Sequence, residues 1–390
     1  MHFHSHLNSA VQILTAYGGE EPFASFLKKY FSANKKHGSK DRKYISHLCY
    51  CFFRLGKSLP DLPMEEKIVV ALFLCSEKPN DFLKNLKPEW NEKADASIGE
   101  KLSILNYPLL IKEIFPWKDE LGDNIDHKKI SESFLTQPDL FLRLRPGREK
   151  IVLLKLKNAG IKFNQTNHSC VALPNATKIE NVIELNKEAV VQDQSSQRIS
   201  EFIEILKPET INHQLKIWDC CAASGGKSIL VKDILSDIDL VVSDLRQSIL
   251  INFKKRFEEA GIANYKSFIT DLSLSSPVIP HSPFELIIAD VPCTGSGTWG
   301  RTPEQLYFFN SREIERYSQL QKKIISNIIP HLLPGGYLSY ITCSVFKKEN
   351  EDIIEFIRQQ TNLEIIKMEN LIGYERKADT MFAALLRKPL

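Results

Sequence analysis

From about residue 210 to the C-terminus, short apolar runs alternate with helical stretches along the chain. The runs are QLKIW, LVVS, FIT, FELIIA and GYLSYIT, and the helical stretches cover 227–236, 246–260, 311–333 and 347–360. This alternation predicts a mostly parallel sheet with helices on both of its faces. Two final runs, LEIIK and MFAALLRK, are joined by a loop without a helix, which predicts an antiparallel hairpin at one sheet edge. We therefore expect an α/β domain over 206–390.

Two other patterns precede this domain. Residues 1–125 repeat apolar side chains every three or four positions, which predicts an all-helical N-terminal domain. Residues 126–205 combine one helical run, IVLLKLKNAG, with the strand-like DLFLRLRP, SCVALP and AVVQDQ, and they predict a small α/β module. A chain of 390 residues is long enough for two or three domains, so we expect three parts with these boundaries.

Composition excludes several classes of protein. The net charge of +3 is too small to imply a polyanionic partner by itself. No run of about 18 uncharged apolar residues is present, and the first residues lack the pattern of a secretory signal, so we expect no membrane span. The 8 cysteines contain no C-x-x-C pair, which argues against a structural zinc site or any other metal site. This cysteine usage predicts a reducing, cytoplasmic location.

Basic residues gather in two places. The segment KKYFSANKKHGSKDRK (28–43) has seven Lys or Arg against the single Asp41. Such a run is most often a solvated surface, and contact with RNA phosphates is the alternative. Arg143 and Arg145 alternate with apolar residues on a predicted strand, so both should face solvent or RNA.

Two glycine-containing loops could be mistaken for nucleotide-binding motifs. In DCCAASGGKS (219–228), a G-x-x-x-x-G-K-S/T loop would need glycine at the position of Cys221. In GSGTWG, the G-x-G-x-x-G pattern from Gly295 to Gly300 follows the fourth strand, and RTP comes next instead of a helix start. We therefore expect neither a triphosphate loop nor a dinucleotide fingerprint.

Acidic residues follow three successive predicted strands, at Asp219, Asp244 and Asp271. One such residue is most often a helix cap or a turn residue. Ligands of open α/β sheets, however, bind outside the carboxyl ends of the strands. Three acids there, beside a Gly-Gly loop, favour S-adenosylmethionine as cofactor. Asp244 would bind its ribose, Asp271 would lie at its adenine end, and the loop 222–227 would lie along its methionine part.

The next two strands bring thiols to the same edge. ADVPCTGSG follows the fourth strand and YITCSVFKKEN the fifth, so Asp290, Cys293 and Cys343 should lie beside the cofactor. A lone cysteine at a strand end is usually inert. A pair at neighbouring strand ends is a candidate for nucleophilic chemistry.

These segments resemble the motifs of a known family. DCCAASGGKS, ADVPCTGSGTWGRTPE, YITCSVFKKENED and DTMFAALLRK are similar, in this order, to motifs of the RNA cytosine-5 methyltransferases of the bacterial RsmB/Sun type. VVQDQSSQ and PDLFLRLRP also resemble this family, whereas the N-terminal helices resemble its NusB-like extension only in SKDRKYISHLCYCFFR. The resemblance implies a Rossmann-like S-adenosylmethionine-dependent methyltransferase domain, preceded by RNA-binding parts.

The implied reaction is methylation of C5 of a cytosine in structured RNA, with ribosomal RNA favoured over transfer RNA. Cytosine C5 is a poor nucleophile until a thiolate adds at C6, an acid group stabilises the charge that develops, and a base later removes the C5 proton. Cys343, Asp290 and Cys293 match these needs in number, but their spacing leaves open which cysteine attacks. The resemblance assigns attack to Cys343 and release to Cys293, and it places Lys227 near the carboxylate and the base.

The site thus has a catalytic and a cofactor-binding set. The catalytic residues are Cys343, Cys293, Asp290 and Lys227. The cofactor-binding residues are Cys221, Ala222, Ala223, Ser224, Gly225, Gly226, Lys227, Asp244, Asp271 and Asp290. Ser224 departs from the family, which has a proline there that fixes the backbone more firmly.

Two alternative functions remain open at this point. The chain could be a catalytically inactive RNA-binding ribosome-assembly factor on a methyltransferase fold, although a relic has no reason to keep every acidic strand end and both cysteines. A nicotinamide-dependent oxidoreductase is the third reading. Binding of one cofactor or the other would separate them. The sequence implies no obligate protein partner.

Overall fold

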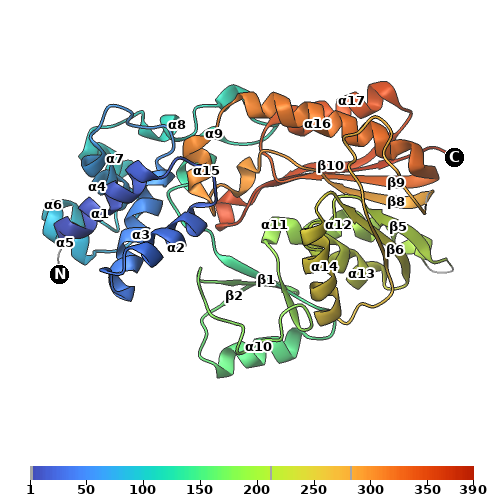
Figure 1. Ribbon diagram of the computed structural model, residues 1–390, viewed down its shortest axis with the longest axis horizontal. Coiled ribbons are helices and arrows are strands. Elements are labelled where there is room, and N and C mark those ends of the chain that lie inside the picture. The colour runs from blue at the N-terminus through green and yellow to red at the C-terminus, as the bar shows by residue number, and fades with distance from the viewer. Residues whose placement is uncertain (1–2, 211–212, 282) are drawn as a thin grey trace. The chain divides into compact units, whose positions relative to one another are not determined.

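The computed structural model describes residues 3–210, 213–281 and 283–390, which form two compact units (Figure 1). The first unit contains the chain up to Asp119 together with Asp126–Gln137 and Thr298–Ser311. The second contains Glu120–Ile125, Pro138–Gly297 and Arg312–Leu390. The division into separate domains at 1–125, 126–205 and 206–390 remains a prediction.

All regular elements of the first unit, within its described residues, are helices, as the apolar periodicity predicted. They are α1 (Phe3–Ala16), α2 (Phe23–Ala33), α3 (Ser39–Arg54), α4 (Met64–Cys75), α5 (Asp81–Leu86), α6 (Pro88–Asn91), α7 (Ile98–Leu105), α8 (Leu110–Ile114), α9 (His127–Ser133) and α15 (Pro303–Phe308). None of the helices in the described part of the chain has the length and apolar character needed to cross a bilayer.

Helix α15 was not predicted, because the polar residues around Pro303 suggested a loop up to about 311. Proline is well tolerated at the first helical position, and Pro303 occupies that position here. The segment around it packs within the helical unit: the buried Arg54 guanidinium donates to the Gly300 carbonyl at 3.1 Å. The ring of Tyr307 lies 5.6 Å from that of Phe53. A segment late in the sequence therefore completes a core made mainly by early helices.

The second unit contains a small antiparallel sheet in the order β2-β3-β1-β4. Its elements are β1 (Leu140–Leu144), α10 (Glu149–Asn158), β2 (Asn164–Asn167), β3 (Cys170–Leu173) and β4 (Ala189–Val191). Val152 and Leu156 of α10 are buried in one cluster with side chains of the sheet, which agrees with the predicted mixture of helix and strands.

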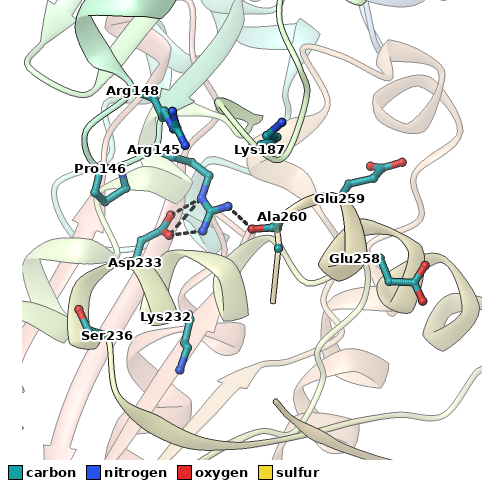
Figure 2. A pocket seen from close by; sticks show the side chains of 11 residues that line it. Arg145, Pro146, Arg148, Lys187, Lys232, Asp233, Ser236, Glu258, Glu259 and Ala260 are labelled. Atoms are coloured by element: carbon teal, nitrogen blue, oxygen red, sulfur yellow. Dashed lines mark hydrogen bonds and ion pairs between the residues drawn. The ribbon is translucent and has the colours of Figure 1, made fainter. Parts of the chain in front are cut away.

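Arg143 and Arg145 do not face solvent, so that prediction was wrong. Arg143 Nη1 lies 2.6 Å from Asp233 Oδ2, and Arg145 Nη2 lies 2.7 Å from Asp233 Oδ1. Figure 2 shows Arg145 between Asp233 and the Ala260 carbonyl, at a cavity of about 590 Å³. Alternation along a strand shows which side chains share a face, but not whether water or another element covers it. Both arginines instead bind the small sheet to the helix that carries Asp233.

The larger sheet has seven strands in the order β10-β11-β9-β8-β5-β6-β7. The strands are β5 (Leu215–Asp219), β6 (Ile238–Asp244), β7 (Lys266–Ile269), β8 (Phe284–Asp290), β9 (Leu332–Thr342), β10 (Glu364–Leu371) and β11 (Met381–Arg387). Neighbours from β7 to β9 are parallel, whereas β11 pairs antiparallel with both β9 and β10. The predicted parallel sheet and its terminal hairpin are confirmed.

Each central strand is buried on both faces. Ile217 and Trp218 are neighbours on β5, yet they belong to separate apolar clusters on opposite sides of the sheet. One cluster includes residues of α12, α13 and α14, and the other includes residues of α16 and α17 (Figure 1). The helices of these layers are α11 (Gln194–Gln197), α12 (Ser200–Ile203), α13 (Gly226–Leu235), α14 (Gln247–Glu259), α16 (Arg312–Ile328) and α17 (Glu351–Gln360). Burial on two faces explains why the strands read as continuous apolar runs.

Candidate active site

The carboxyl ends of five parallel strands line one edge of the large sheet, in the spatial order β9, β8, β5, β6 and β7. The residues singled out from the sequence lie at these ends. Cys343 follows β9 directly, Asp290 ends β8, Asp219 ends β5, Asp244 ends β6, and Asp271 comes shortly after β7. With neighbouring strands about 4.8 Å apart, this edge spans roughly 19 Å. It therefore has room for an extended ligand with thiols at one end and carboxylates at the other.

The two predicted cysteines face each other. Their Sγ atoms are 3.3 Å apart, and both side chains are partly exposed. The hydrogen bond to Cys343, together with burial, holds the pKa of the Cys293 thiol well above its ordinary value. Cys293 is thus a thiol that keeps its proton firmly.

Lys227 and Asp290 form an ion pair, with Nζ 2.5 Å from Oδ2. Burial alone would lower the pKa of the Lys227 ammonium group. The charge of Asp290 and its hydrogen bond outweigh this effect and leave the pKa raised. The Cys343 sulfur also interacts electrostatically with Lys227. The four predicted catalytic side chains therefore lie at the same strand ends, and a fixed positive charge stands beside Cys343.

The loop between β5 and α13 is held in an unusual conformation. Ala223 and Gly225 have positive φ values of 45° and 83°. A Cβ atom on Gly225 would lie 2.8 Å from the ring of Phe253, so only glycine fits at this position. Ser224, which replaces the family's proline, accepts a hydrogen bond from Arg256 Nη1 at 2.9 Å. This contact restrains the backbone where a proline ring is absent.

The remaining loop residues lie where the sequence placed them. Cys221 is partly exposed, and the buried Ala222 donates its N–H to the Ser243 carbonyl at 3.0 Å. Gly226 is the first residue of α13, and a Cβ there would meet only Arg256, at 3.6 Å. The loop thus presents small residues at the start of a ten-residue helix.

Asp244 and Asp271, the carboxylates at the β6 and β7 side of this edge, already accept hydrogen bonds from nearby residues. Asp244 accepts the N–H of Ala223 at 3.1 Å and that of Arg246 at 2.9 Å, so it supports the loop as well as the strand end. Asp271 accepts the hydroxyl and the N–H of Ser273 at 2.6 and 2.9 Å, and these bonds lower the pKa of Asp271. Their predicted contacts with ribose and adenine stay predictions.

Part of this chain is similar in sequence to known proteins. Residues 203–385 match the sequence model of the family described as 16S rRNA methyltransferase RsmB/F. Ribosomal RNA small subunit methyltransferase B of Proteus mirabilis (strain HI4320) is 27% identical over 273 residues, which are 67% of this chain and 62% of that protein. The match therefore spans about three fifths of that relative's length. The domain that carries the site belongs to the RsmB/F family.

Solved structures agree with the fold of this RsmB/F domain. The crystal structure of PH0851 has a TM-score of 0.69 at 17% identity, covering 94% of this chain and 95% of that one. NSun6 from Pyrococcus horikoshii, solved with SFG, has a TM-score of 0.57 at 14% identity and covers 71% and 96% of the two chains. At this level of identity the likeness concerns the fold. Together with the sheet described above, it confirms the predicted methyltransferase fold.

Asp219 has a position in the RsmB/F domain that the sequence could not reveal. Its side chain is buried beneath the loop, where Oδ2 accepts the Ser228 hydroxyl at 2.5 Å. Burial, together with the charges of Asp290 and Asp244, raises the pKa of Asp219 to about 7 against the opposing effects of Ser228 and Lys227. Asp219 therefore supports the loop from below, while the other strand-end acids lie nearer the surface.

The structure explains why position 297, in the pattern GSGTWG, is a glycine. Gly297 N–H donates to the Cys343 carbonyl, and the Gly297 carbonyl accepts the Thr380 N–H, both at 2.9 Å. A Cβ atom on Gly297 would lie only 1.9 Å from the Thr380 oxygen. Glycine is required here by close packing of backbones, which agrees with the expectation that this pattern is no dinucleotide fingerprint.

Proposed function

We propose that this chain transfers a methyl group from S-adenosylmethionine to C5 of a cytosine in structured RNA, with ribosomal RNA ahead of transfer RNA. The observation that carries the proposal is the pair of sulfurs 3.3 Å apart, beside the Lys227–Asp290 ion pair, at the ligand-binding edge of a methyltransferase sheet. The names of the family and of the Proteus mirabilis relative, which specify ribosomal RNA, support the substrate class. Free thiols fit a reducing cytoplasm.

The residues at the strand ends suit S-adenosylmethionine. Small loop residues at 221–226 leave backbone accessible, and Asp244 and Asp271 supply acceptors for hydroxyl and amino groups. Leu245 and Ile269 are 59% and 52% exposed next to these carboxylates, so apolar surface is available for a flat ring. SFG, an analogue of this cofactor, was present in the NSun6 structure. When bound, the cofactor supplies a methyl group on a positively charged sulfur.

We assign the other steps of the reaction to Cys343, Asp290 and Cys293. Cys343 Sγ forms a bond to C6 of cytosine, and the Asp290 carboxyl group, hydrogen-bonded at N3, stabilises the electron density that moves onto the ring. C5 then carries both the methyl group and its original proton. Bond formation at C6 removes the hydrogen bond and the charge of Cys343 that hold the pKa of Cys293 up, so the partly exposed Cys293 can then give its own proton to solvent. As a thiolate, Cys293 takes the C5 proton, the C6–S bond breaks, and the Cys343 thiolate is restored.

The electrostatics favour this division between the two cysteines. The raised pKa of Cys293 disfavours its thiolate, which is the form that attacks. The ammonium group of Lys227 interacts electrostatically with Cys343. The role of Cys343 as the nucleophile is the one that the family resemblance assigns to it, and the raised pKa of Cys293 agrees with this assignment.

The function can be tested by bisulfite mapping of RNA from cells with and without this gene, combined with transfer of labelled methyl from the cofactor by the purified protein. We expect one or a few cytosines to lose their modification without the gene and to regain it with the protein. Cofactor binding measured by calorimetry is the control. Tight binding without methyl transfer to cytosine, or the absence of both, would contradict the proposal, and the latter would favour an RNA-binding assembly factor.

We also propose that the basic segment of the helical unit contacts RNA phosphates. Lys28, Lys35, Lys36 and Lys43 are exposed and have no ion-pair partner among the described residues. The logarithm of the RNA association constant should fall linearly with the logarithm of the salt concentration. Reversing two charges, as in K35E/K36E, should make this slope shallower by about 1.5, since each phosphate contact contributes about 0.7 to 0.9 to it. RNA binding at several salt concentrations checks this, with K84E/K93E on exposed residues of the same unit as control. Equal slopes for the two double variants would contradict the contact.

A further inference from the structure

Glu349 is a buried acid outside the catalytic set. It lies in the turn between β9 and α17 and has an exposed fraction of 0%. In the sequence it belongs to the charged run KKENED, which gives no sign of burial. A carboxyl group without access to water requires hydrogen-bond partners, so its contacts show what it holds.

The first set of contacts reaches the loop that carries Cys293. Glu349 Oε1 accepts the backbone N–H of Thr294 at 2.9 Å, and Oε2 accepts the Thr294 hydroxyl at 2.6 Å. Thr294 is the residue next to Cys293. Both groups of this one residue are thus bound by the same carboxyl group.

The second set reaches the loop that carries Cys343. Glu349 Oε2 accepts the hydroxyl of Ser344, the residue next to Cys343, at 2.5 Å. A third contact comes from α16, where Gln321 Nε2 donates to Glu349 Oε1 at 3.2 Å and to the Pro292 carbonyl at 2.9 Å. The carboxyl group therefore connects the residues that directly follow the two cysteines.

The negative charge of Glu349 also acts on the thiols. It is one of the influences that raise the pKa of Cys293, after the hydrogen bond to Cys343, burial and the charge of Cys343. Burial raises the pKa of Glu349 itself, against the opposing hydrogen bonds from Ser344, Thr294 and Gln321. Two effects of Glu349 can thus be separated by substitution: its reach across both loops and its charge.

We propose that Glu349 is a positioning residue for methyl transfer, because its carboxyl group spans the two thiol loops and holds their sulfurs together. This inference rests on the proposed roles of Cys343 and Cys293. Misplacing a reacting group by about 1 Å can lower the reaction rate about 100-fold. Shortening the side chain of residue 349 by one bond should therefore lower kcat. The backbone bond from Gly297 to Cys343 remains in any variant of Glu349 and keeps the loops folded.

Two substitutions separate reach from charge. Glu349→Asp keeps the charge but shortens the side chain by one methylene group, so it cannot reach both loops. Glu349→Gln keeps the length: its oxygen can accept from Thr294 N–H, and its amide can donate to the neighbouring hydroxyl oxygens. Glu351→Asp is the matched control, since Glu351 is partly buried and accepts hydrogen bonds from Asp123 N–H at 2.9 Å and from Asn370 Nδ2 at 2.7 Å, away from the cysteines.

The full-length variants are compared in two assays. Steady-state methyl transfer gives kcat and KM separately, and dibromobimane, which bridges two nearby thiols, reports the Cys293–Cys343 distance after peptide mapping. Glu349→Asp should lower kcat and bridging by about 100-fold with KM changed by less than about 3-fold. Glu349→Gln should stay within about 10-fold of the unmodified protein, and Glu351→Asp should change neither quantity by more than about 2-fold.

The proposal is overturned if Glu349→Asp behaves like Glu351→Asp, or if Glu349→Gln loses as much as or more than Glu349→Asp. The second result would mean that charge matters and reach does not. The bridging assay needs no methyl transfer. If the unmodified protein methylates no RNA, the bridging rates still decide whether Glu349 positions the sulfurs, and only the proposed function fails.

Discussion

Cys343→Ala should reduce methyl transfer to cytosine by a factor of roughly 10⁴ to 10⁶, the loss typical of removing a nucleophile that acts with its partners. Without this sulfur C6 receives no adduct, and C5 remains too weak a nucleophile to take the methyl group. The measurement is transfer of labelled methyl to RNA under single-turnover conditions, with cofactor binding followed by calorimetry. Cofactor affinity should be almost unchanged, because the change affects the reacting end of the site.

Cys170→Ala is the control for loss of a thiol, since Cys170 is buried in the small sheet and has no place in the reaction. Its turnover should match that of the unmodified protein. Turnover of the Cys343→Ala variant within about 10-fold of the unmodified protein would contradict the assignment of the nucleophile, since even supporting groups of such sets cost more.

Asp290→Asn should lower kcat by roughly 10² to 10⁴, the range that a positioned acid or base contributes. The amide cannot take up a proton and pass it to N3 of the ring, as the carboxylate of the ion pair can. It also removes the charge that raises the pKa of Lys227, and burial then lowers this pKa. An ammonium group that is only 13% exposed is left without its partner, so the melting temperature should fall as well.

The comparison for this variant is Asp239→Asn, which breaks the exposed Lys266–Asp239 pair of the same sheet. Surface pairs contribute little, so its activity and melting temperature should stay close to those of the unmodified protein. If Asp290→Asn and Asp239→Asn had the same kcat, the proposed role of the Asp290 carboxyl group would be wrong.

Much of the methyltransferase fold was predictable because its strands are buried on both faces. Ile217 and Trp218 both read as apolar since each meets its own helix layer. The site followed from the same logic: parallel strands end at one edge, so polar and thiol residues placed just after them must meet there. This is why Cys343 and Cys293, separated by two helices and a strand, could be paired in advance.

The features that escaped prediction depend on partners far away in the sequence. Arg143 looked like a surface residue until Asp233 was seen opposite it. Residues 298–311 looked like a polar loop, although they complete a core with the early helices. Glu349 stands in a charged run, and only the convergence of Thr294 and Ser344 on its carboxyl group shows that it is buried. Periodicity identifies which side chains are apolar, but it does not identify their partners.

The most direct test of the thiol mechanism is peptide mapping of the covalent complex that Cys293→Ala protein should form with RNA and cofactor. Attack at C6 would still occur, release would be blocked, and a denaturant-resistant complex should accumulate. After protease and nuclease digestion, mass spectrometry should find the methylated cytosine nucleotide on the peptide that contains Cys343. A trapped complex in Cys343→Ala protein instead, with the nucleotide on Cys293, would contradict the account.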